Sequence, residues 1–414
     1  MNNKENIYSI SKVNFYLSVL LAFMIPINRI VSTYIMVLWA VTWIIERIRK
    51  VPCQKLNKNQ YYILISIIIF YILHVVGLIN TTNIENGFID LRINLPLLVF
   101  PLFFIFHNRN YNKFYHFILL AFISGTILTL LFLYVRAIYF YPILHKDAFY
   151  YTQISYMFHP SYLSMYVIFS VIALIYLYEN NLKKFLLPLI FILLFLIASI
   201  YFLASKTNFL SFLIIFFIYT LIKLFKKYKI IFLSIFILVI TGSYFAIKSN
   251  YHLNTLFQLN SNTFQNLDKT SKASNIVRIY IIKSGLQLIK ENPFGYGTGD
   301  VKDELMRKYS DNGYTGALEE KLNAHNQYLE TTIGLGIQGT IILLFILFFP
   351  LAIAIKSRNY LLYLFILLVI INFLSESMLN RQDGVVFITF FLTLLISIQH
   401  SKAVKIKQTI SKAG

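Results

Sequence analysis

The residues that could carry out chemistry lie in three short polar segments of a largely apolar chain. Arg278 lies in a helical pattern, and a glycine-rich run at 292–300 follows it. His325–Asn326 comes shortly before three closely spaced glycines, and Ser205–Lys206 follows an earlier apolar run. Cationic side chains and the N–H groups of glycine turns bind phosphate oxygens, and an imidazole exchanges a proton near neutral pH. These residue types make the three segments candidates for an anion-binding and proton-transferring site.

Taken singly, each segment also has a structural interpretation. The glycine run could be a flexible turn, and without a preceding strand it is no dinucleotide-binding fingerprint. His325 could be a solvated loop residue, and Lys206 could anchor a span by reaching the headgroups. Arg278 could bind anionic lipid. The choice depends on the elements that position these residues.

The composition is that of an integral membrane protein. Of 414 residues, 58% are hydrophobic and 13% are charged, against about 25% charged residues in ordinary soluble domains. Long apolar runs recur along the chain, and in lipid such runs must satisfy their backbone groups internally as helices. The alternating pattern of a membrane β-barrel is absent. We therefore predict an all-α membrane protein with about 12 transmembrane helices, at 10–27, 30–46, 61–79, 89–106, 114–135, 161–178, 185–203, 208–222, 230–247, 334–355, 360–375 and 384–399.

The net charge of +20 does not indicate nucleic-acid binding, because Lys and Arg concentrate in alternate short loops. This is the bias expected of cytoplasmic loops. It predicts that both termini are cytoplasmic and that the loop with the single cysteine, Cys53, is cytoplasmic too. The basic residues on the predicted cytoplasmic side are Arg47, Arg49, Lys50, Lys55, Lys58, Arg109, Lys113, Lys183, Lys184, Lys223, Lys226, Lys227, Lys229, Lys356, Arg358, Lys402, Lys405, Lys407 and Lys412.

One outside segment, 248–333, is much longer than the others. It separates helices 1–9 (residues 1–247) from helices 10–12 and a cytoplasmic tail (residues 334–414). Its first part, 250–275, is rich in Asn, Ser, Thr and Gln and is predicted to be poorly ordered. An amphipathic helix is predicted at 274–291, where an apolar stripe has Arg278 on its shoulder. The stripe consists of Ile279, Ile282, Leu286 and Ile289.

The combined motifs resemble those of a known family. An Arg in a loop helix is followed by Asn-Pro and a Gly-x-Gly turn, and a His-Asn pair is followed at fixed spacing by glycines. The residues concerned are Arg278, Gly295, Gly297, His325, Asn326, Gly336, Gly339 and Thr340. This pattern resembles the O-antigen ligase family, whose members have about twelve spans and a large periplasmic loop between the ninth and tenth.

The resemblance implies a glycosyltransferase of the bacterial inner membrane, with its active site on the periplasmic face. The donor would be a glycan on undecaprenyl diphosphate. The acceptor would be a hydroxyl of lipid A–core in the ligases of lipopolysaccharide assembly, or of a growing glycan in the related polymerases. Arg278 would bind the diphosphate and His325 would act on the acceptor hydroxyl. Lys206, where many members have Arg, would be a second diphosphate ligand that lacks the guanidinium fork.

The resemblance also implies inversion at the anomeric carbon and no cofactor. No metal is expected, because cationic side chains can offset the diphosphate charge. Asp300, Asp303 and Glu304 lack the spacing of the Asp-x-Asp pair that metal-using transferases carry, and they are interpreted as a solvated acidic turn.

Three alternatives remain open, of which a structural or signalling membrane protein gives no reason for the spacing from His325 to the glycines. A glycan polymerase shares these motifs, and twelve spans also suit a transporter or a flippase. Transporters keep ionisable residues near the membrane midplane, whereas the polar cluster here lies in an outside segment. Polar residues at His159, Glu376 and Arg381 also look like segments of family members, but the sequence assigns them no function.

Overall fold

The computed structural model describes residues 2–106, 110–180, 182–225, 228–254, 269–270 and 274–398. These residues form helices and connecting loops, and no strand occurs among them. The predicted cytoplasmic residues Arg109, Lys226 and Lys227, the tail after residue 398 and most of the polar stretch 250–275 lie outside the described part of the chain.

Nine helical segments of the described chain are long and apolar enough to cross a membrane. Three shorter apolar helices accompany them: the Ile10–Met24 part of α1 (Asn2–Met24), α18 (Tyr360–Phe373) and α19 (Gln382–Ile398). The multi-pass character is thus confirmed, while the count of twelve stays a prediction. The nine segments are α2 (Arg29–Ile48), α3 (Lys58–Gly77) with η1 (Leu78–Asn80), α4 (Ile84–Asn94) with α5 (Pro96–Ile105), α6 (Asn110–Leu144) with η2 (His145–Phe149), α8 (Pro160–Asn180), η3 (Lys183–Phe185) with α9 (Leu186–Leu203), α10 (Lys206–Leu224), α11 (Lys229–Ser249) and α17 (Gln327–Lys356).

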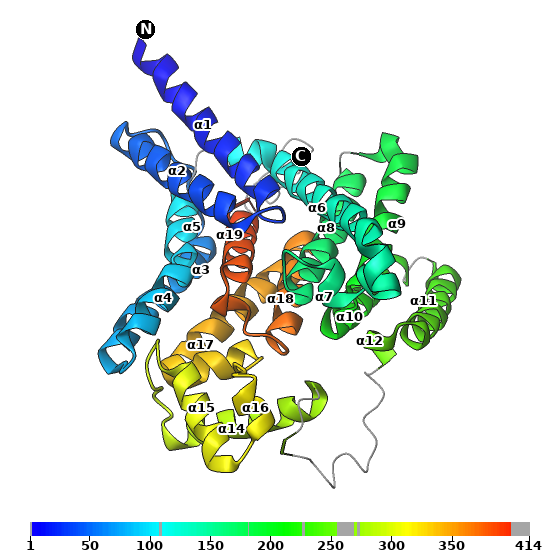
Figure 1. Ribbon diagram of the computed structural model, residues 1–414. Coiled ribbons are helices and arrows are strands. Elements are labelled where there is room, and N and C mark those ends of the chain that lie inside the picture. Colours follow the sequence, from blue (N-terminus) through cyan, green and yellow to red (C-terminus); the bar gives the residue numbers. More distant parts are fainter. Residues whose placement is uncertain are drawn as a thin grey trace.

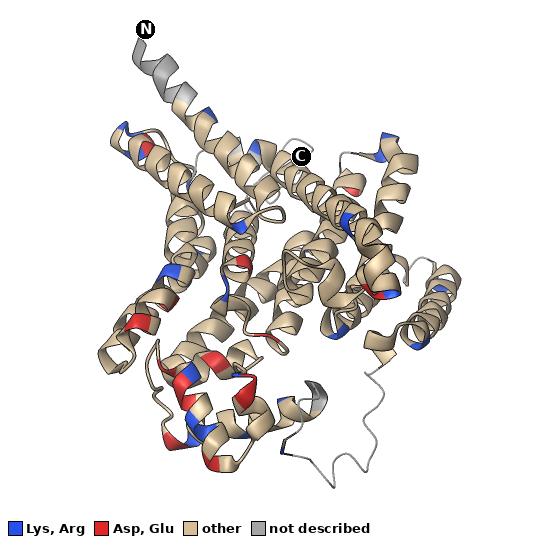
Figure 2. Ribbon diagram, in the orientation of Figure 1, with Lys and Arg blue, Asp and Glu red and all other residues tan. Residues whose placement is uncertain are grey.

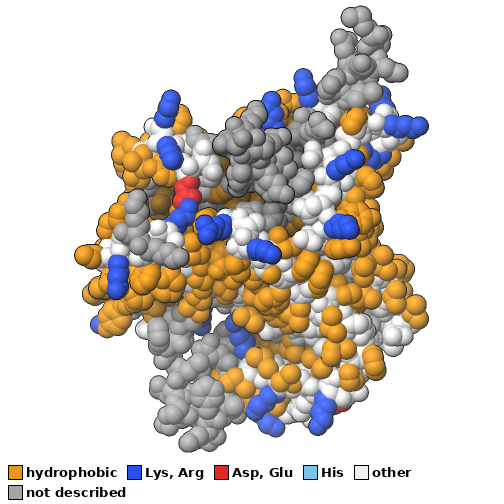
Figure 3. Space-filling view, turned by 180° about the vertical axis from the view of Figure 1, so that it is seen from behind, with side chains coloured by type: hydrophobic (Ala, Val, Ile, Leu, Met, Phe, Trp, Pro, Cys, Tyr) orange, Lys and Arg blue, Asp and Glu red, His pale blue; other side chains and the backbone are white. Residues whose placement is uncertain are grey.

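The centre of the bundle is formed by α8 and α19, whose side chains are mostly buried, together with α18 (Figure 1). Phe122 of α6, Phe169 of α8, Phe365 of α18 and Phe391 of α19 pack there, with ring centroids 4.6–6.4 Å apart. Such aromatic pairs add about 0.5–1.5 kcal/mol each beyond the burial of their area. By contrast, α11 lies at the edge and is almost wholly exposed. The reverse face shows a broad hydrophobic band (Figure 3).

Two predicted spans differ from the observed helices because of local features. The span expected at 89–106 is broken: α4 starts earlier, where the Asn83 side chain accepts the N–H of Asn86, and Pro96 begins a new helix. Proline has no N–H to continue a helix. The helix that holds the span expected to end at 135 continues to Leu144. Arg136, in this extension, donates to the Gln153 carbonyl at 2.8 Å, and its guanidinium lies over the Tyr156 ring.

The long segment before α17 folds into helices of its own, α14 (Ser274–Glu291), α15 (Val301–Asn312) and α16 (Thr315–Glu319), after the one-turn α12 (Tyr251–Asn254). They lie together at one end of the bundle, where a dense group of Asp and Glu side chains gathers (Figure 2). A separate apolar cluster holds them against the start of α17. Its members include Tyr280, Ile281, Leu288, Leu305, Tyr309, Leu329 and Ile333.

The predicted apolar stripe of α14 is not the face that this cluster buries. Ile282 and Leu286 are exposed, and Ile279 and Ile289 are only partly covered. The buried face is instead Val277, Tyr280, Ile281, Ser284, Gly285 and Leu288. The helix carries apolar residues on two adjoining faces, so its periodicity did not decide which one packs against α15 and α17.

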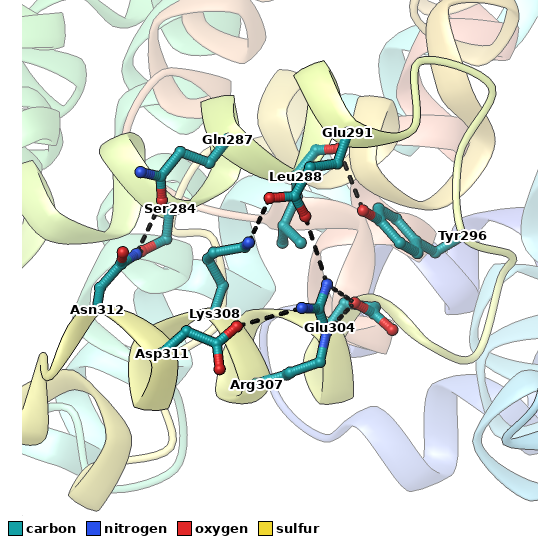
Figure 4. Close-up of polar contacts among 10 residues, drawn as sticks. All are labelled: Ser284, Gln287, Leu288, Glu291, Tyr296, Glu304, Arg307, Lys308, Asp311 and Asn312. Carbon is teal, nitrogen blue, oxygen red and sulfur yellow. Dashed lines mark hydrogen bonds and ion pairs between the residues drawn. The ribbon is translucent and has the colours of Figure 1, made fainter.

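Ion pairs fix α14 to α15 on the outer side (Figure 4). The Arg307 guanidinium bonds to the carboxylates of Glu304 at 2.8 Å and Asp311 at 3.2 Å, and it approaches Glu291 of α14 at 3.5 Å. Lys308 binds Glu291 as well, and this hydrogen bond is the main cause of the lowered pKa of Glu291. Single exposed pairs contribute little, but a network holds its members in register. The network thereby sets the position of α14.

The predicted orientation can be tested with Cys53, which is the single cysteine and is exposed. In sealed right-side-out membrane vesicles, a membrane-impermeant maleimide should leave Cys53 unlabelled, because its loop is predicted to face the cytoplasm. The same reagent should label Lys302→Cys in a Cys53→Ser background, since Lys302 is exposed on α15. Mass spectrometry measures the adduct, and a permeant maleimide is the control for reactivity. Labelling of Cys53 from outside would reverse the topology.

Candidate active site

The carboxylate of Glu376 joins two of the segments that the sequence analysis singled out, those of Arg278 and His325. Glu376 lies between α18 and η4 (Met378–Asn380) and is buried. Its Oε2 lies 3.2 Å from Nδ1 of His325, and its Oε1 lies 3.7 Å from Nη2 of Arg278. Ser161, at the start of α8, donates its hydroxyl to the same Oε1 at 3.4 Å. The predicted candidates Arg278 and His325 therefore share one anionic partner, which the sequence analysis had left without a function.

The charge state of Glu376 follows from these neighbours. Burial by itself would raise the pKa of the carboxyl, but the hydrogen bond from His325 and the electrostatic effects of His325, His159 and Arg278 outweigh it and lower the pKa. Glu376 is therefore ionised at neutral pH. An ionised carboxylate only accepts hydrogen bonds, so Nδ1 of His325 carries a proton and Nε2 is left to exchange one.

His325 is held in an unusual backbone conformation. Its φ is +44°, in the left-handed region that residues other than glycine rarely adopt. Its N–H donates to Oδ1 of Asn323 at 3.1 Å. Asn326, a predicted support residue, caps α17 by accepting the N–H of Leu329 at 3.0 Å and donates its amide to the Leu374 carbonyl at 3.1 Å. These bonds tie the start of α17 to the turn that carries Glu376.

A second carboxylate stabilises the contact between His325 and Glu376. Glu330, on the first turn of α17, accepts the N–H of Ala324 at 3.2 Å and the hydroxyl of Ser377 at 3.0 Å. Ala324 directly precedes His325, and Ser377 directly follows Glu376. Both ends of the His325–Glu376 contact are thus fixed to one side chain.

Lys206 and His159 approach this site from other helices. Lys206 begins α10, and its charge acts on that of Arg278. The α10 start is fixed by Asn208, which donates to the Ser161 carbonyl at 2.9 Å. His159 immediately precedes α8; burial lowers its pKa, Glu376 opposes this, and Arg381 adds to the lowering. The fold thus brings His159 within electrostatic range of Glu376 and Arg381, and Lys206 within electrostatic range of Arg278.

The glycine run serves to join the loop to α17. Gly336 has φ +69° and ψ −171°, which breaks α17. The N–H groups of Tyr296 and Gly297 bond to the carbonyls of Ile333 and Gly334 at 2.9 and 3.0 Å. These donors are engaged within the protein instead of facing a phosphate. Gly339, also expected as support, lies buried one turn beyond the break.

The acidic residues after the glycine run do not form the solvated turn that was expected. Asp300 is buried, and its carboxylate accepts the N–H groups of Thr82 and Asn83 at 2.7 and 2.8 Å. Asp303 accepts the amide of Asn83 at 2.7 Å. A carboxylate satisfies unpaired N–H groups at the start of a helix, and the cluster thereby anchors the loop to the start of α4. The described residues contain no group of three or more His, Cys, Asp or Glu that could hold a metal ion.

Part of the chain that carries this site matches a known protein family. Residues 191–344 match the family model described as O-antigen ligase. Over this stretch the chain is similar to the O-antigen ligase family. The O-antigen ligase stretch runs from α9 into α17 and contains Lys206, Arg278 and His325. Glu376 and His159 lie outside it in sequence and join it through the fold. No curated protein matches the chain.

The break in α17 leads to a prediction about stability. Gly336→Ala should destabilise the protein, because a Cβ there would lie 2.4 Å from backbone atoms of Phe294 and because this backbone conformation favours glycine. The conformational cost alone is about 1–3 kcal/mol. The matched control is Gly242→Ala in α11, where a Cβ would meet no atom within 4 Å. Thermal unfolding in detergent measures both variants. Equal melting temperatures would contradict the close packing of the glycine run against the break in α17.

The ionised Glu376 leads to a prediction about pH. Because its folded pKa is below its usual value of 4.5, its contribution to stability is present above that pH and is lost as the pH falls through the folded pKa. At neutral pH, Glu376→Gln should therefore unfold at a lower temperature. Its free energy of unfolding should be lower by about 1–3 kcal/mol, because charged partners are left unpaired. The difference from wild type should vanish in acid. Asp311→Asn, an exposed carboxylate of α15, is the control, and a difference that persists unchanged in acid would refute the ionised state.

Proposed function

We propose that this chain transfers a glycan from an undecaprenyl-diphosphate carrier to an acceptor hydroxyl at the periplasmic face of the bacterial inner membrane. The observation that carries the proposal is the meeting of Arg278 and His325 at the Glu376 carboxylate, beside Lys206. A diphosphate ligand and a proton acceptor are the two groups that such a transfer requires. The match to the O-antigen ligase family supports lipid-linked glycans as the substrate class.

The diphosphate would bind to Arg278 and Lys206. The Arg278 side chain is 39% exposed, so its guanidinium can contact a ligand while Glu376 holds one side of it. A guanidinium offers parallel hydrogen bonds to phosphate oxygens. Lys206 adds a second positive charge from a different helix, and together they offset the charge that develops on the departing diphosphate. No metal ion enters the proposal.

His325 would activate the acceptor. With Nδ1 bonded to Glu376, Nε2 takes the proton of the acceptor hydroxyl as its oxygen attacks the anomeric carbon. The new bond joins the acceptor oxygen to that carbon, and the bond to the diphosphate oxygen breaks on the opposite face. The anomeric configuration is therefore inverted. Glu376 orients the imidazole and stabilises its protonated form.

Transfer to lipid A–core or a similar lipid acceptor makes the chain a ligase, and this is the acceptor class we propose. The family description favours it. Transfer to a growing glycan would make it a polymerase with the same site. The two differ only in which hydroxyl reaches Nε2 of His325.

Purified protein should transfer a diphosphate-linked glycan to a lipid acceptor in the presence of a chelator. Arg278→Ala should lower the rate by about 10²–10³-fold, as for lost transition-state charge contacts, and His325→Ala by about 10²–10⁴-fold. Arg278→Lys should retain part of the activity, because it keeps the charge without the fork. Transferred glycan is read on a gel.

Lys283→Ala, an exposed cation of the same helix, should transfer like wild type. Cells without the gene should accumulate full-length glycan on its carrier; single repeat units would identify a polymerase. Loss of activity in the chelator with recovery in magnesium would refute the metal-independent mechanism. Unimpaired Arg278→Ala and His325→Ala variants would refute the site.

A further inference from the structure

An aromatic cavity lies where α6, α9 and α11 end. Its volume is about 590 Å³, within the range of small-molecule sites. The rings that line it come from four elements and the turns between them. They are Tyr141, Phe149, Tyr150, Tyr201, Phe202 and Tyr251.

The rings form a continuous set. Tyr150 lies 5.5 Å from Phe202 and 6.1 Å from Tyr201 between ring centroids, and Phe149 lies 6.4 Å from Phe202. Tyr251 is 75% exposed, so one face of the cavity wall is accessible. The rings therefore surround a hollow that a ligand could enter.

The charges of the side chains that line the cavity cancel. Lys146 and Asp147 supply one positive and one negative charge, and both are exposed. The Ser249 hydroxyl and the Tyr201 hydroxyl lie 3.0 Å apart at the wall. Such a lining suits a neutral ligand that carries hydroxyl groups.

One residue, Tyr151, contacts the cavity lining and is within electrostatic range of Glu376 and Arg278. Tyr151, in the one-turn helix α7 (Tyr151–Ile154), directly follows the lining residue Tyr150 and stacks on the lining residue His252 with 5.1 Å between centroids. Burial raises the pKa of Tyr151; Glu376 adds to the rise and Arg278 opposes it. Tyr151 is thus near both the cavity and the charged site.

We propose that this cavity is a carbohydrate subsite that holds neutral sugar residues of the glycan undergoing transfer. Sugar rings present C–H faces that pack on the negative faces of aromatic rings, and their hydroxyls bond to polar groups at the rim. The location next to Tyr151 places the bound sugars beside the proposed diphosphate ligands. The assignment of the sugars to a transferred glycan rests on the proposed function.

The competing interpretation is that these rings belong to a belt of aromatic side chains at the membrane–water interface. Tyr and Trp gather at membrane surfaces, where each ring faces the headgroups. Here six rings instead converge on one hollow from α6, α9, α11–α12 and the η2–α7 connection. A belt gives no reason for this convergence.

Binding is tested on the full-length protein in detergent, by saturation-transfer NMR with short neutral oligosaccharides that carry hexose, N-acetylhexosamine and deoxyhexose residues. Wild type should bind at least one of them. Tyr251→Ala should weaken that binding by about tenfold or more, and Tyr251→Phe, which keeps the ring, should not. Tyr139→Ala is the matched control: Tyr139 is 76% exposed on α6 and does not line the cavity.

The His325→Ala variant separates this proposal from the proposed function. It should bind the oligosaccharide like wild type although it cannot transfer. Oligosaccharide binding that Tyr251→Ala abolishes, in a protein that transfers no glycan, would support the cavity and refute the transferase. Absence of binding by wild type, or equal binding by Tyr251→Ala, would overturn the cavity whatever the transfer assay gives. Equal effects of Tyr251→Ala and Tyr139→Ala would identify an interfacial belt instead.

Discussion

The site depends on a single buried carboxylate. Glu376 is the partner that Arg278, His325 and Ser161 have in common, and these residues belong to α14, the start of α17 and the start of α8. A buried carboxylate is costly unless charged or hydrogen-bonding groups satisfy it. That requirement draws three distant segments to one point, so the same interaction that stabilises the fold also brings the proposed catalytic groups together.

The charge balance around Glu376 leaves room for an anion. Arg278 and Lys206 act on each other as like charges, and Arg381 contributes a third positive charge nearby. The neighbouring carboxylate Glu376 is already shared between a cation and an imidazole. The diphosphate of the proposed donor would relieve the remaining repulsion between these cations. The resting site is thus electrostatically prepared for a ligand of high negative charge.

Hydropathy located the apolar helices because lipid imposes a long uniform run on every span. It missed the break before Pro96 and the extension of α6 past Arg136, which depend on individual side-chain contacts. Arg278 and His325 were selected from motif spacing, but the function of Glu376 could not be, because it arises from pairings with residues far away in the chain. The buried face of α14 was mistaken for the same reason: two apolar faces adjoin on this helix, and its partners α15 and α17 decide between them. Asp300 shows the opposite error, in which a carboxylate that looks solvated in sequence is buried by a distant helix start.

The glycine turn seated in the break of α17 also limits how the gene can recombine. Residues 293–297 bond to the backbone at 333–337. Thr298 donates to carbonyls in the last turns of α3, and Asp300 accepts two N–H groups just before α4. A loop exchanged for that of a related protein would pack on residues that do not match it at both places. The smallest segment that can be exchanged intact therefore includes the end of α3, the start of α4, the loop and the first half of α17, which are scattered along the chain. Diversity in such proteins is easier to gain by point substitution around a fixed loop than by exchange of the loop itself.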